Sequence, residues 1–434
     1  MPRLTPITVL AGFLGAGKTT LLQYLLENKQ GVKVGVIVND MASVNIDAAL
    51  VSNKLQGQEG SASIELQNGC VCCTLEQDLL DGVVKLVRKH KLDYVVVECS
   101  GVAEPLKIAE MFNLASDSGM PVSRAATLCN LVTVVDGRAF KALMASNETL
   151  SDRQDLAGLT KKQINSGKKK GDAYGGSTRA VADLLMEQVE CADTLVLNKV
   201  DCLDQEELGR VQALLRGLNP HAEIHLASFG RVPLKAILLD EESEAAERVG
   251  IPTDASVEEE EEAVDPDMSC CERRAAKGRH EVNFGIWSFV YNARKPFHPL
   301  RLGSVLNNLQ KVAPHALTLM SEGAPETQER KEPMAGVLRS KGFVWIASNS
   351  DTAYYWAHAG LHFQLEPSDP WWAAVGEEQW PSDPSARQTI AGEVAKGGAC
   401  GDRRNELVFI GVGMNEGAIR QVLDAALMGE GEEW

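Results

Sequence analysis

Short apolar runs alternate with helical stretches over the first half of the chain, from residue 7 to about residue 228. Each run has the length of a strand, is rich in Val, Ile and Leu, and is apolar at consecutive positions, as in strands buried on both faces of a parallel sheet. The runs are ITVLAGF, KVGVIVND, DYVVVECS, LVTVVD, DTLVLNK and AEIHLAS. Amphipathic segments between them predict helices over residues 19–27, 75–90 and 181–191. This repetition predicts a doubly wound, mostly parallel α/β domain that binds ligands at the carboxyl ends of its strands.

The pattern changes near residue 239. Residues 240–280 contain an acidic run and few apolar side chains, so we expect a solvated linker there. A second pattern then begins, with the strand-like runs GIWSFVYNA, GVLRSKGFVWIAS, AYYWAHAGLHFQL and NELVFIGV and with helices predicted over 299–309 and 415–427. Strands with two helices on one side indicate a small α+β domain. The expected divisions are a first domain over residues 1–239, the linker over 240–280 and a second domain over 281–434.

Length and charge narrow the class of protein. The chain has 434 residues, more than the roughly 250–300 at which a single core stops growing, which agrees with two domains. A formal net charge of -17 argues against sequence-independent binding to nucleic acid and against docking on an anionic membrane. The N-terminal sequence lacks the features of a secretory signal, and no apolar run approaches the ~20 residues of a membrane span. We therefore expect a cytoplasmic protein whose cysteines stay reduced.

A phosphate-binding loop is predicted where the first strand meets the first helix. The sequence GFLGAGKT from Gly12 to Thr19 fits G-x-x-x-x-G-K-[ST], follows a strand and opens a helix. Its glycines let backbone N–H groups turn toward phosphates, Lys18 reaches the terminal phosphates and acts in catalysis, and the Thr19 hydroxyl can bind Mg²⁺. A tight glycine turn alone would not require Lys-Thr at the helix start. The residues expected to bind nucleotide here are Gly12, Gly15, Ala16, Gly17, Lys18, Thr19 and Thr20.

A second motif indicates which base is bound. Asn198, Lys199 and Asp201 form N-K-x-D directly after the strand TLVLN. The carboxylate can accept hydrogen bonds from the ring N–H and exocyclic amine of guanine, whereas adenine offers the opposite pattern, and the lysine stem can pack on the base. The alternative is a polar turn that caps the next segment. In a phosphate-loop domain the motif favours guanine.

Acidic residues also end two of the buried strands. Glu98 ends DYVVVECS and is placed to act on Mg²⁺, directly or through water, or to orient the attacking water. The alternative is a structural Glu held by backbone donors. Asp136 ends LVTVVD, and for it the catalytic and structural readings have equal support.

Three cysteines lie close together in NGCVCCTL, between the second strand and the helix predicted from residue 75. Cys70 and Cys72 point the same way if the backbone there is extended. Three thiolates, or two with a carboxylate or water, would satisfy Zn²⁺, and thiolates also select Cu(I) and Co²⁺. Cys70 and Cys73 could instead form a C-x-x-C redox pair, and buried structural cysteines are a third reading.

The remaining cysteines and histidines give weaker signals. Cys99 and Cys191 lie in or beside apolar segments and are expected in the core, and the histidines of the second domain are expected to be structural. His358 and His362 have a zinc-compatible spacing only on a helix, and their surroundings are typical of a strand. A candidate auxiliary metal site in the linker consists of Cys270, Cys271 and His280.

Together these motifs resemble the CobW-type family of P-loop GTPases, metal-handling proteins related to the nickel chaperones of hydrogenase and urease. GFLGAGKTT is similar to the phosphate loop of the family, NGCVCCTL to its Cys-x-Cys-Cys motif, VVVECSG to its Walker-B-like strand and NKVD to its guanine motif. Residues 281–427 resemble its C-terminal domain, so the resemblance covers nearly the whole chain.

The resemblance implies GTP hydrolysis coupled to the loading or delivery of a metal, most often zinc. In the family the cysteine motif lies in a switch region, where GTP and Mg²⁺ would arrange the thiolates and hydrolysis would loosen the site. The implied cofactors are GTP, Mg²⁺ and Zn²⁺, with Co²⁺ second. The implied partner is a client metalloprotein bound through the second domain, and a nucleotide-dependent dimer is a further expectation.

The chain also departs from the family pattern. Many members have Asn-Glu-Phe-Gly after the second strand, and here Asp40 occupies the matching acidic position as a further candidate metal ligand. The stretch VNDMASVNID resembles a branch with zinc-starvation proteins and nitrile hydratase activators, which keeps open a cobalt-handling activator. Two other classes stay open: a small-molecule kinase using ATP, which NKVD argues against, and a non-enzymatic zinc sensor, which GTP turnover would exclude.

Overall fold

The computed structural model describes residues 4–27, 31–39, 62–65, 72–153, 179–239, 286–322, 332–429 and 431–432. The chain forms two compact units, the first mainly from residues up to 257 and the second mainly from residues after it. Their boundary falls outside the described residues, in the stretch expected as a linker. No helix within the described ranges combines the length and the apolar character needed to cross a membrane.

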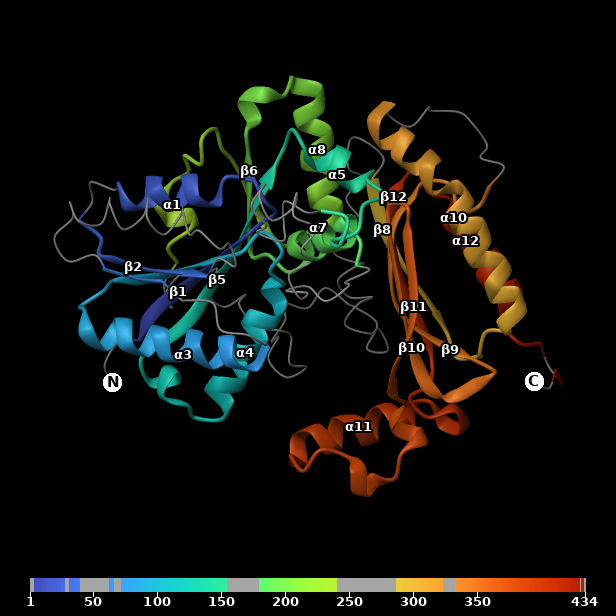
Figure 1. Ribbon diagram of the computed structural model, residues 1–434. Helices are drawn as coiled ribbons and strands as arrows, with labels where there is room; N and C mark the ends of the chain where they lie inside the picture. Colours follow the sequence, from blue (N-terminus) through green and yellow to red (C-terminus); the bar gives the residue numbers. More distant parts are fainter. Residues whose placement is uncertain are drawn as a thin grey trace, which may run out of the picture. The chain divides into compact units, whose positions relative to one another are not determined.

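The first unit is built on a seven-stranded sheet in the order β3-β2-β4-β1-β5-β6-β7, and every neighbouring pair is parallel (Figure 1). All carboxyl ends therefore lie at one edge, which confirms the predicted doubly wound α/β fold. The strands are β1 (Thr5–Ala11), β2 (Val34–Asn39), β3 (Ala62–Glu65), β4 (Tyr94–Cys99), β5 (Ala126–Asp136), β6 (Thr194–Asn198) and β7 (Glu223–Leu226).

Helices cover both faces of this sheet. In β4, Val96 packs in the core that contains Leu21 of α1, while Val95 and Val97 pack in the opposite core with Phe112 of α4. Consecutive residues of the strand are thus buried on opposite faces, which explains why the run is apolar throughout. Figure 1 shows α1 on one side of the sheet and α3 and α4 on the other. The helices are α1 (Lys18–Leu26), α3 (Cys72–Lys89), α4 (Pro105–Asp117), α5 (Phe140–Met144), α7 (Val181–Glu190) and α8 (Gln205–Leu218).

Two strands of this sheet differ from expectation. The sequence analysis did not predict β3, a four-residue strand too short to give an apolar run. It expected β7 to be buried on both faces, but the outer residues of β7 are exposed and its inner residues are only half-buried. The reason is that β7 lies at the edge of the sheet and pairs only with β6.

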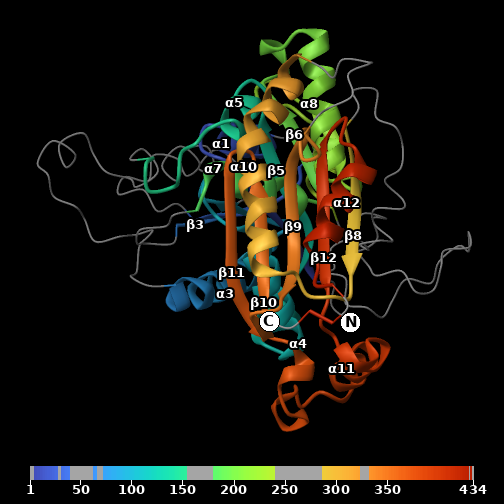
Figure 2. The same ribbon diagram turned by 90° about the vertical axis from the view of Figure 1, so that its right-hand side faces the viewer.

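The second unit contains an antiparallel sheet in the order β11-β10-β9-β12-β8. Helices α10 and α12 lie on one face of it (Figure 2), and Phe289, Phe409 and Trp356 of the sheet share a core with Leu309 and Leu423 of these helices. This confirms the predicted α+β class. The elements are β8 (Ile286–Ala293), α10 (Pro299–Glu322), β9 (Val337–Ile346), β10 (Asn349–Ala359), β11 (His362–Pro370), α11 (Pro384–Lys396), β12 (Asn405–Val412) and α12 (Glu416–Ala426).

Three details of the second unit correct the sequence analysis. The run AYYWAHAGLHFQL is two strands, β10 and β11, because the chain turns at Gly360, whose φ is 57°. Helix α10 continues to Glu322, well past the predicted end at residue 309. Helix α11 was not predicted, because Ile390 is its only buried residue and it therefore carries no apolar stripe.

Candidate functional site

The loop between β1 and α1 has a backbone that only glycine can adopt at three positions. Gly12, Gly15 and Gly17 have φ values of 134°, 76° and 107°. A Cβ on Gly12 would lie 2.3 Å from the carbonyl oxygen of Val134, whereas a Cβ on Gly15 would meet nothing within 4 Å. The loop is thus packed on the sheet on one side and open at Gly15. Its backbone N–H groups and the start of α1 offer a cradle that fits a phosphate chain.

Lys18 lies folded back over this loop. Its ammonium group donates hydrogen bonds to the carbonyl oxygens of Gly12 at 2.8 Å and Phe13 at 3.2 Å. The side chain is buried, with 8% of its surface exposed. A buried cation at the mouth of an anion cradle favours negatively charged ligands, because their oxygens can replace these carbonyl contacts.

Thr19 and Glu98 form the next contact of the site. The Thr19 hydroxyl donates to Glu98 Oε1 at 2.8 Å. The sheet register explains the meeting, since Leu10 of β1 lies opposite Glu98 of β4, directly before the loop. The two side chains supply oxygen ligands of the kind that Mg²⁺ prefers. The expected residues are therefore together, and their roles remain predictions.

Asn198 connects the phosphate loop to the loop after β7. Its Nδ2 donates to the carbonyl oxygen of Ala16 at 2.9 Å, and its Oδ1 accepts from the backbone N–H of Gly230 at 3.0 Å. A Cβ on Gly17 would lie 2.3 Å from the same amide nitrogen. The residue is 2% exposed. Asn198 thus holds together the loops on either side of the candidate nucleotide site.

Lys199 and Asp136 are paired beside it. Lys199 has a left-handed backbone, with φ 62°, and its Nζ lies 2.6 Å from Asp136 Oδ2. The other carboxylate oxygen of Asp136 accepts from the backbone N–H groups of Arg138 and Ala139. Asp136 therefore holds a turn and fixes Lys199, which favours its structural reading. Asp201 lies in a short 3-10 helix, Val200–Cys202, and is exposed.

The sequence analysis missed residues of the loop that follows β7. Phe229 has φ 56° and is 68% exposed. A Cβ on Gly230 would lie 2.7 Å from the backbone nitrogen of Leu21, so the loop packs closely on α1. The sequence signal that could have indicated this loop is Gly230, which follows the last strand of the domain at the edge where ligands bind.

The cysteine motif lies partly within the described residues. Helix α3 begins at Cys72, three residues before the predicted start, so the backbones of Cys72 and Cys73 form its first turn. The extended backbone under which Cys70 and Cys72 would point the same way is therefore not present at Cys72. Among the described residues no cluster of His, Cys, Asp or Glu is arranged to hold a metal. The candidate ligands that lie outside the described residues are Cys70, Asp40, Cys270, Cys271 and His280.

Cys99 and Cys191 are shielded from solvent to different degrees. Cys99 is 1% exposed, and burial raises the pKa of its thiol to about 12. Cys191 is partly exposed, and burial followed by the charges of Glu187 and Glu190 raises its pKa to about 12. Thiols with so high a pKa stay protonated at neutral pH and are poor nucleophiles and metal ligands.

The parallel sheet, the glycine cradle and the Thr19–Glu98 pair define a P-loop nucleotide-binding protein. Two family profiles match the chain. The profile of the CobW/HypB/UreG nucleotide-binding domain matches residues 6–226, and that of the cobalamin synthesis protein cobW C-terminal domain matches residues 286–427. The chain belongs to the CobW family.

Individual relatives are similar along different lengths. The chain is 33% identical over 442 residues to the zinc-regulated GTPase metalloprotein activator 1 of Dictyostelium discoideum, a match over 98% of this chain and 80% of that protein. It is 33% identical over 240 residues to the zinc chaperone CobW of Pseudomonas aeruginosa, over 54% of this chain and 59% of that protein. The crystal structure of Zn(II)-bound YjiA GTPase from E. coli aligns with 98% of this chain and 100% of its own at 19% identity, with a TM-score of 0.36 that supports no inference.

Proposed function

We propose that this chain is a GTP-dependent metallochaperone, which hydrolyses GTP and delivers zinc to a client metalloprotein. The observation that carries the proposal is the meeting of three motifs at the carboxyl edge of one parallel sheet. The phosphate loop, the acid at the end of β4 and the N-K-x-D motif after β6 lie there in contact, in a chain of the CobW family. The names of its relatives, a zinc-regulated GTPase metalloprotein activator and a zinc chaperone, support zinc as the cargo.

The nucleotide half of the activity is assigned to residues of the first unit. The glycine cradle, with Ala16 and Thr20, receives the phosphates, and Lys18 replaces its carbonyl contacts with phosphate oxygens. Thr19 and Glu98 provide the oxygen ligands for Mg²⁺, which supplies neutralisation of phosphate charge when bound. Asp201 reads the guanine edge, and Lys199, fixed by Asp136, provides a stem for the base to pack on. Asn198 holds the two loops around it in place.

The cargo half is assigned to Cys70, Cys72 and Cys73. Helix α3 follows β3 in a parallel sheet, so its first turn begins near the edge that also carries the phosphate loop. The amino end of a helix favours the thiolate form that binds zinc. Nucleotide and metal would then be coupled if GTP stabilises the arrangement of the cysteine segment that binds metal. Co²⁺ is the second candidate cargo because thiolates also bind it.

The remaining assignments are proposals of the same kind. We assign residues 1–239 to the nucleotide and metal domain, 240–280 to a linker and 281–434 to the domain that binds the client. A nucleotide-dependent dimer and a cytoplasmic location complete the proposal.

A zinc competition titration, with and without Mg²⁺ and GTP, tests the proposal. We expect zinc affinity to rise at least about tenfold with GTP, a coupling of typical size for two linked sites. Ser at both Cys70 and Cys72 should abolish this rise and leave GTP affinity unchanged. The matched control combines Cys99→Ser and Cys191→Ser and should retain the rise, because the raised pKa of both thiols makes them poor metal ligands. If the double Cys70 and Cys72 variant bound zinc as tightly as the original chain in GTP, the cargo assignment would be wrong.

A further inference from the structure

The segment after Glu98 rests directly on the phosphate loop. A Cβ on Gly101 would lie 2.7 Å from the backbone nitrogen of Leu14 and 2.9 Å from its Cα, so the two backbones touch. In GTPases, switch segments beside the phosphates are ordered by contacts to the terminal phosphate and Mg²⁺. The position of residues 101–104 on the loop therefore matters for turnover, and the question is what holds them there.

Gln188 of α7 is one of the groups that hold this segment. Its side-chain amide donates to the carbonyl oxygens of Ala103 at 3.0 Å and Gly101 at 3.4 Å. The side chain is 1% exposed, and the backbone carbonyl of Gln188 accepts from the Thr133 hydroxyl at 2.6 Å, which fixes α7 on β5. A buried amide attached to the sheet is thus aimed at two successive carbonyls of the segment.

A second feature of Gln188 is its side-chain oxygen, Oε1, beside a cavity. Gln188 also lines a cavity whose walls include Phe13 and Leu14 of the phosphate loop. Within the described part of the chain, Gln188 Oε1 is buried and accepts no hydrogen bond. A buried acceptor without a partner is costly, so a shift of the segment that satisfied it would be favoured.

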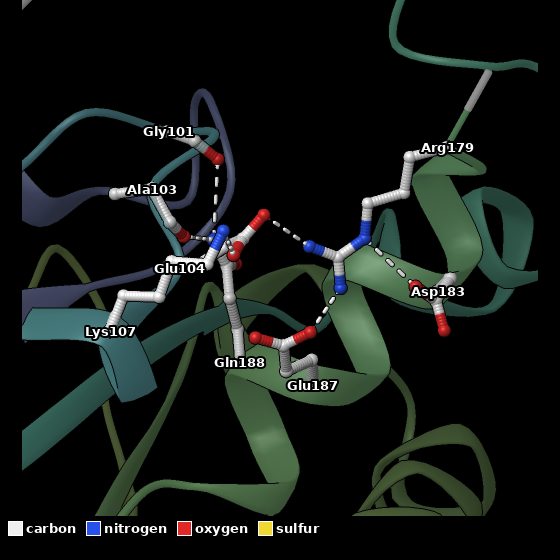
Figure 3. A network of polar contacts seen from close by, with 8 residues as sticks. All are labelled: Gly101, Ala103, Glu104, Lys107, Arg179, Asp183, Glu187 and Gln188. Atoms are coloured by element: carbon white, nitrogen blue, oxygen red, sulfur yellow. Dashed lines mark hydrogen bonds and ion pairs between the residues drawn. The ribbon is translucent and has the colours of Figure 1, made fainter. Parts of the chain in front are cut away.

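Arg179, two residues before the start of α7, holds the far end of the segment (Figure 3). Its guanidinium donates to Glu104 at 2.7 Å and to Asp183 at 2.8 Å, and it also pairs with Glu187. Glu104 is the residue that precedes α4, whereas Asp183 and Glu187 belong to the same helix as Gln188. Of these three ion pairs, the pair with Glu104 alone crosses to residues 101–104.

The segment that pairs with Arg179 also contacts the phosphate loop. The backbone carbonyl of Arg179 accepts a hydrogen bond from the backbone N–H of Leu150 at 2.9 Å, which joins these two segments of the chain. Three residues beyond Leu150, the guanidinium of Arg153 lies 5.5 Å from the centre of the Phe13 ring. Both of the joined segments therefore contact the candidate nucleotide site, one through Glu104 and the other through Phe13.

We propose that Gln188 and Arg179 are positioning residues for GTP hydrolysis, which hold residues 101–104 in register with the phosphate loop. This inference rests on the proposed GTPase activity. Neither residue binds nucleotide in this scheme: Gln188 fixes the start of the segment and Arg179, through Glu104, fixes its end. Loosening either contact should slow the catalytic step and spare binding, because the groups that grip the phosphates remain in place.

A matched pair of variants tests this. Glu104→Gln and Asp183→Asn each remove one ion pair of Arg179 and preserve side-chain shape, but only the first loosens the segment. Glu104→Gln also removes the ion pair with Lys107, so Lys107→Met, which removes that pair alone, is a second control and should keep kcat within about twofold. We expect Glu104→Gln to lower kcat for GTP about three- to tenfold with KM within about twofold, a coupling of the size seen for residues outside a binding site. Asp183→Asn should keep kcat within about twofold of the original chain. Thermal unfolding of both variants checks that they fold equally well.

Gln188→Met supplies an independent measurement, since it removes both hydrogen bonds with little change in volume. It should lower kcat as Glu104→Gln does, and the double variant should lose less than the product of the two effects, because both contacts hold one segment. If Glu104→Gln and Asp183→Asn had equal kcat values while the original chain hydrolysed GTP, the positioning role would be refuted. If the original chain did not hydrolyse GTP, the proposed function itself would fail.

Discussion

The two sheets of the chain use buried polar side chains in different ways. At the carboxyl edge of the parallel sheet they join segments that are far apart in sequence, as Glu98 accepts from Thr19 and Asn198 joins Ala16 to Gly230. In the antiparallel sheet they close on partners within or beside the strands. The indole of Trp356, for example, donates to the Ser340 hydroxyl at 2.8 Å.

This difference separates polar groups that can change partners from those that cannot. At the parallel edge both partners of Asn198 belong to loops, and loops can move when a ligand binds. In the antiparallel sheet Asn405 accepts from the backbone N–H of Trp345 and donates to the carbonyl of Lys295, both at 2.7 Å, so its partners are fixed by the fold. Replacing groups of the first kind should change activity, and replacing groups of the second kind should change stability.

The largest expected effect is that of Lys18→Ala. The variant loses the one ammonium group that the described structure places over the phosphate cradle. We expect kcat/KM for GTP to fall by about 100-fold or more, as for loss of a preorganised electrostatic contact. Steady-state hydrolysis at saturating Mg²⁺ measures this.

Asn405→Ala is the control from the other sheet. It leaves a backbone N–H and a carbonyl group unpaired, so we expect a loss of roughly 1–3 kcal/mol in the free energy of unfolding. Its kcat/KM for GTP should remain within about twofold of the original chain. Turnover by Lys18→Ala close to the original rate, or loss of turnover in a folded Asn405→Ala, would break the distinction between the two sheets.

A smaller effect concerns His358 and pH. Burial, with a further contribution from Arg339, lowers the pKa of this histidine from 6.5 to about 3. The histidine therefore binds a proton below pH 6.5 in the unfolded chain, but only below about pH 3 in the folded chain. Above pH 6.5 the histidine is neutral in both states, and as the pH falls from 6.5 toward 3 proton uptake by the unfolded chain alone lowers the free energy of unfolding.

We expect His358 to lower the free energy of unfolding by about 2 kcal/mol between pH 6.5 and pH 5, at about 1.4 kcal/mol per pH unit. Denaturant unfolding of the original chain and of His358→Leu at the two pH values measures it. The leucine variant should be less stable at pH 6.5, because it loses the hydrogen bond between Nε2 and the Gly360 carbonyl, but it should lack this part of the pH dependence. Equal pH dependence in both proteins would show that His358 titrates normally.

Much of this arrangement could be read from the sequence because local patterns encode it. Apolar runs gave the buried parallel strands, and the phosphate loop and N-K-x-D are continuous motifs placed after strands. The partner of Asn198 was not predictable in this way, because Ala16 lies 182 positions away and no pattern marks it. The same holds for Arg179 and Glu104, which are 75 positions apart.

Some other features that were not predicted from the sequence had a weak local signal. Gln188 lies among buried residues of α7, and a polar side chain on the apolar face of a helix indicates a buried hydrogen bond. The early start of α3 was missed because the apolar periodicity begins only after Cys72 and Cys73. Short or edge elements such as β3 depend on pairing with neighbours, which no single segment of sequence displays.

The central claim is that the nucleotide held at this site controls the metal, and a change of base specificity tests it most directly. Asp201→Asn replaces an acceptor by an amide donor, which should weaken GTP about 10- to 100-fold and favour xanthosine triphosphate, whose base carries a carbonyl in place of the amine. Zinc affinity is then measured with each nucleotide and Mg²⁺. The account predicts that zinc affinity rises with GTP in the original chain and with xanthosine triphosphate in the variant. A variant whose zinc affinity still rises with GTP as in the original chain, and ignores xanthosine triphosphate, would contradict it.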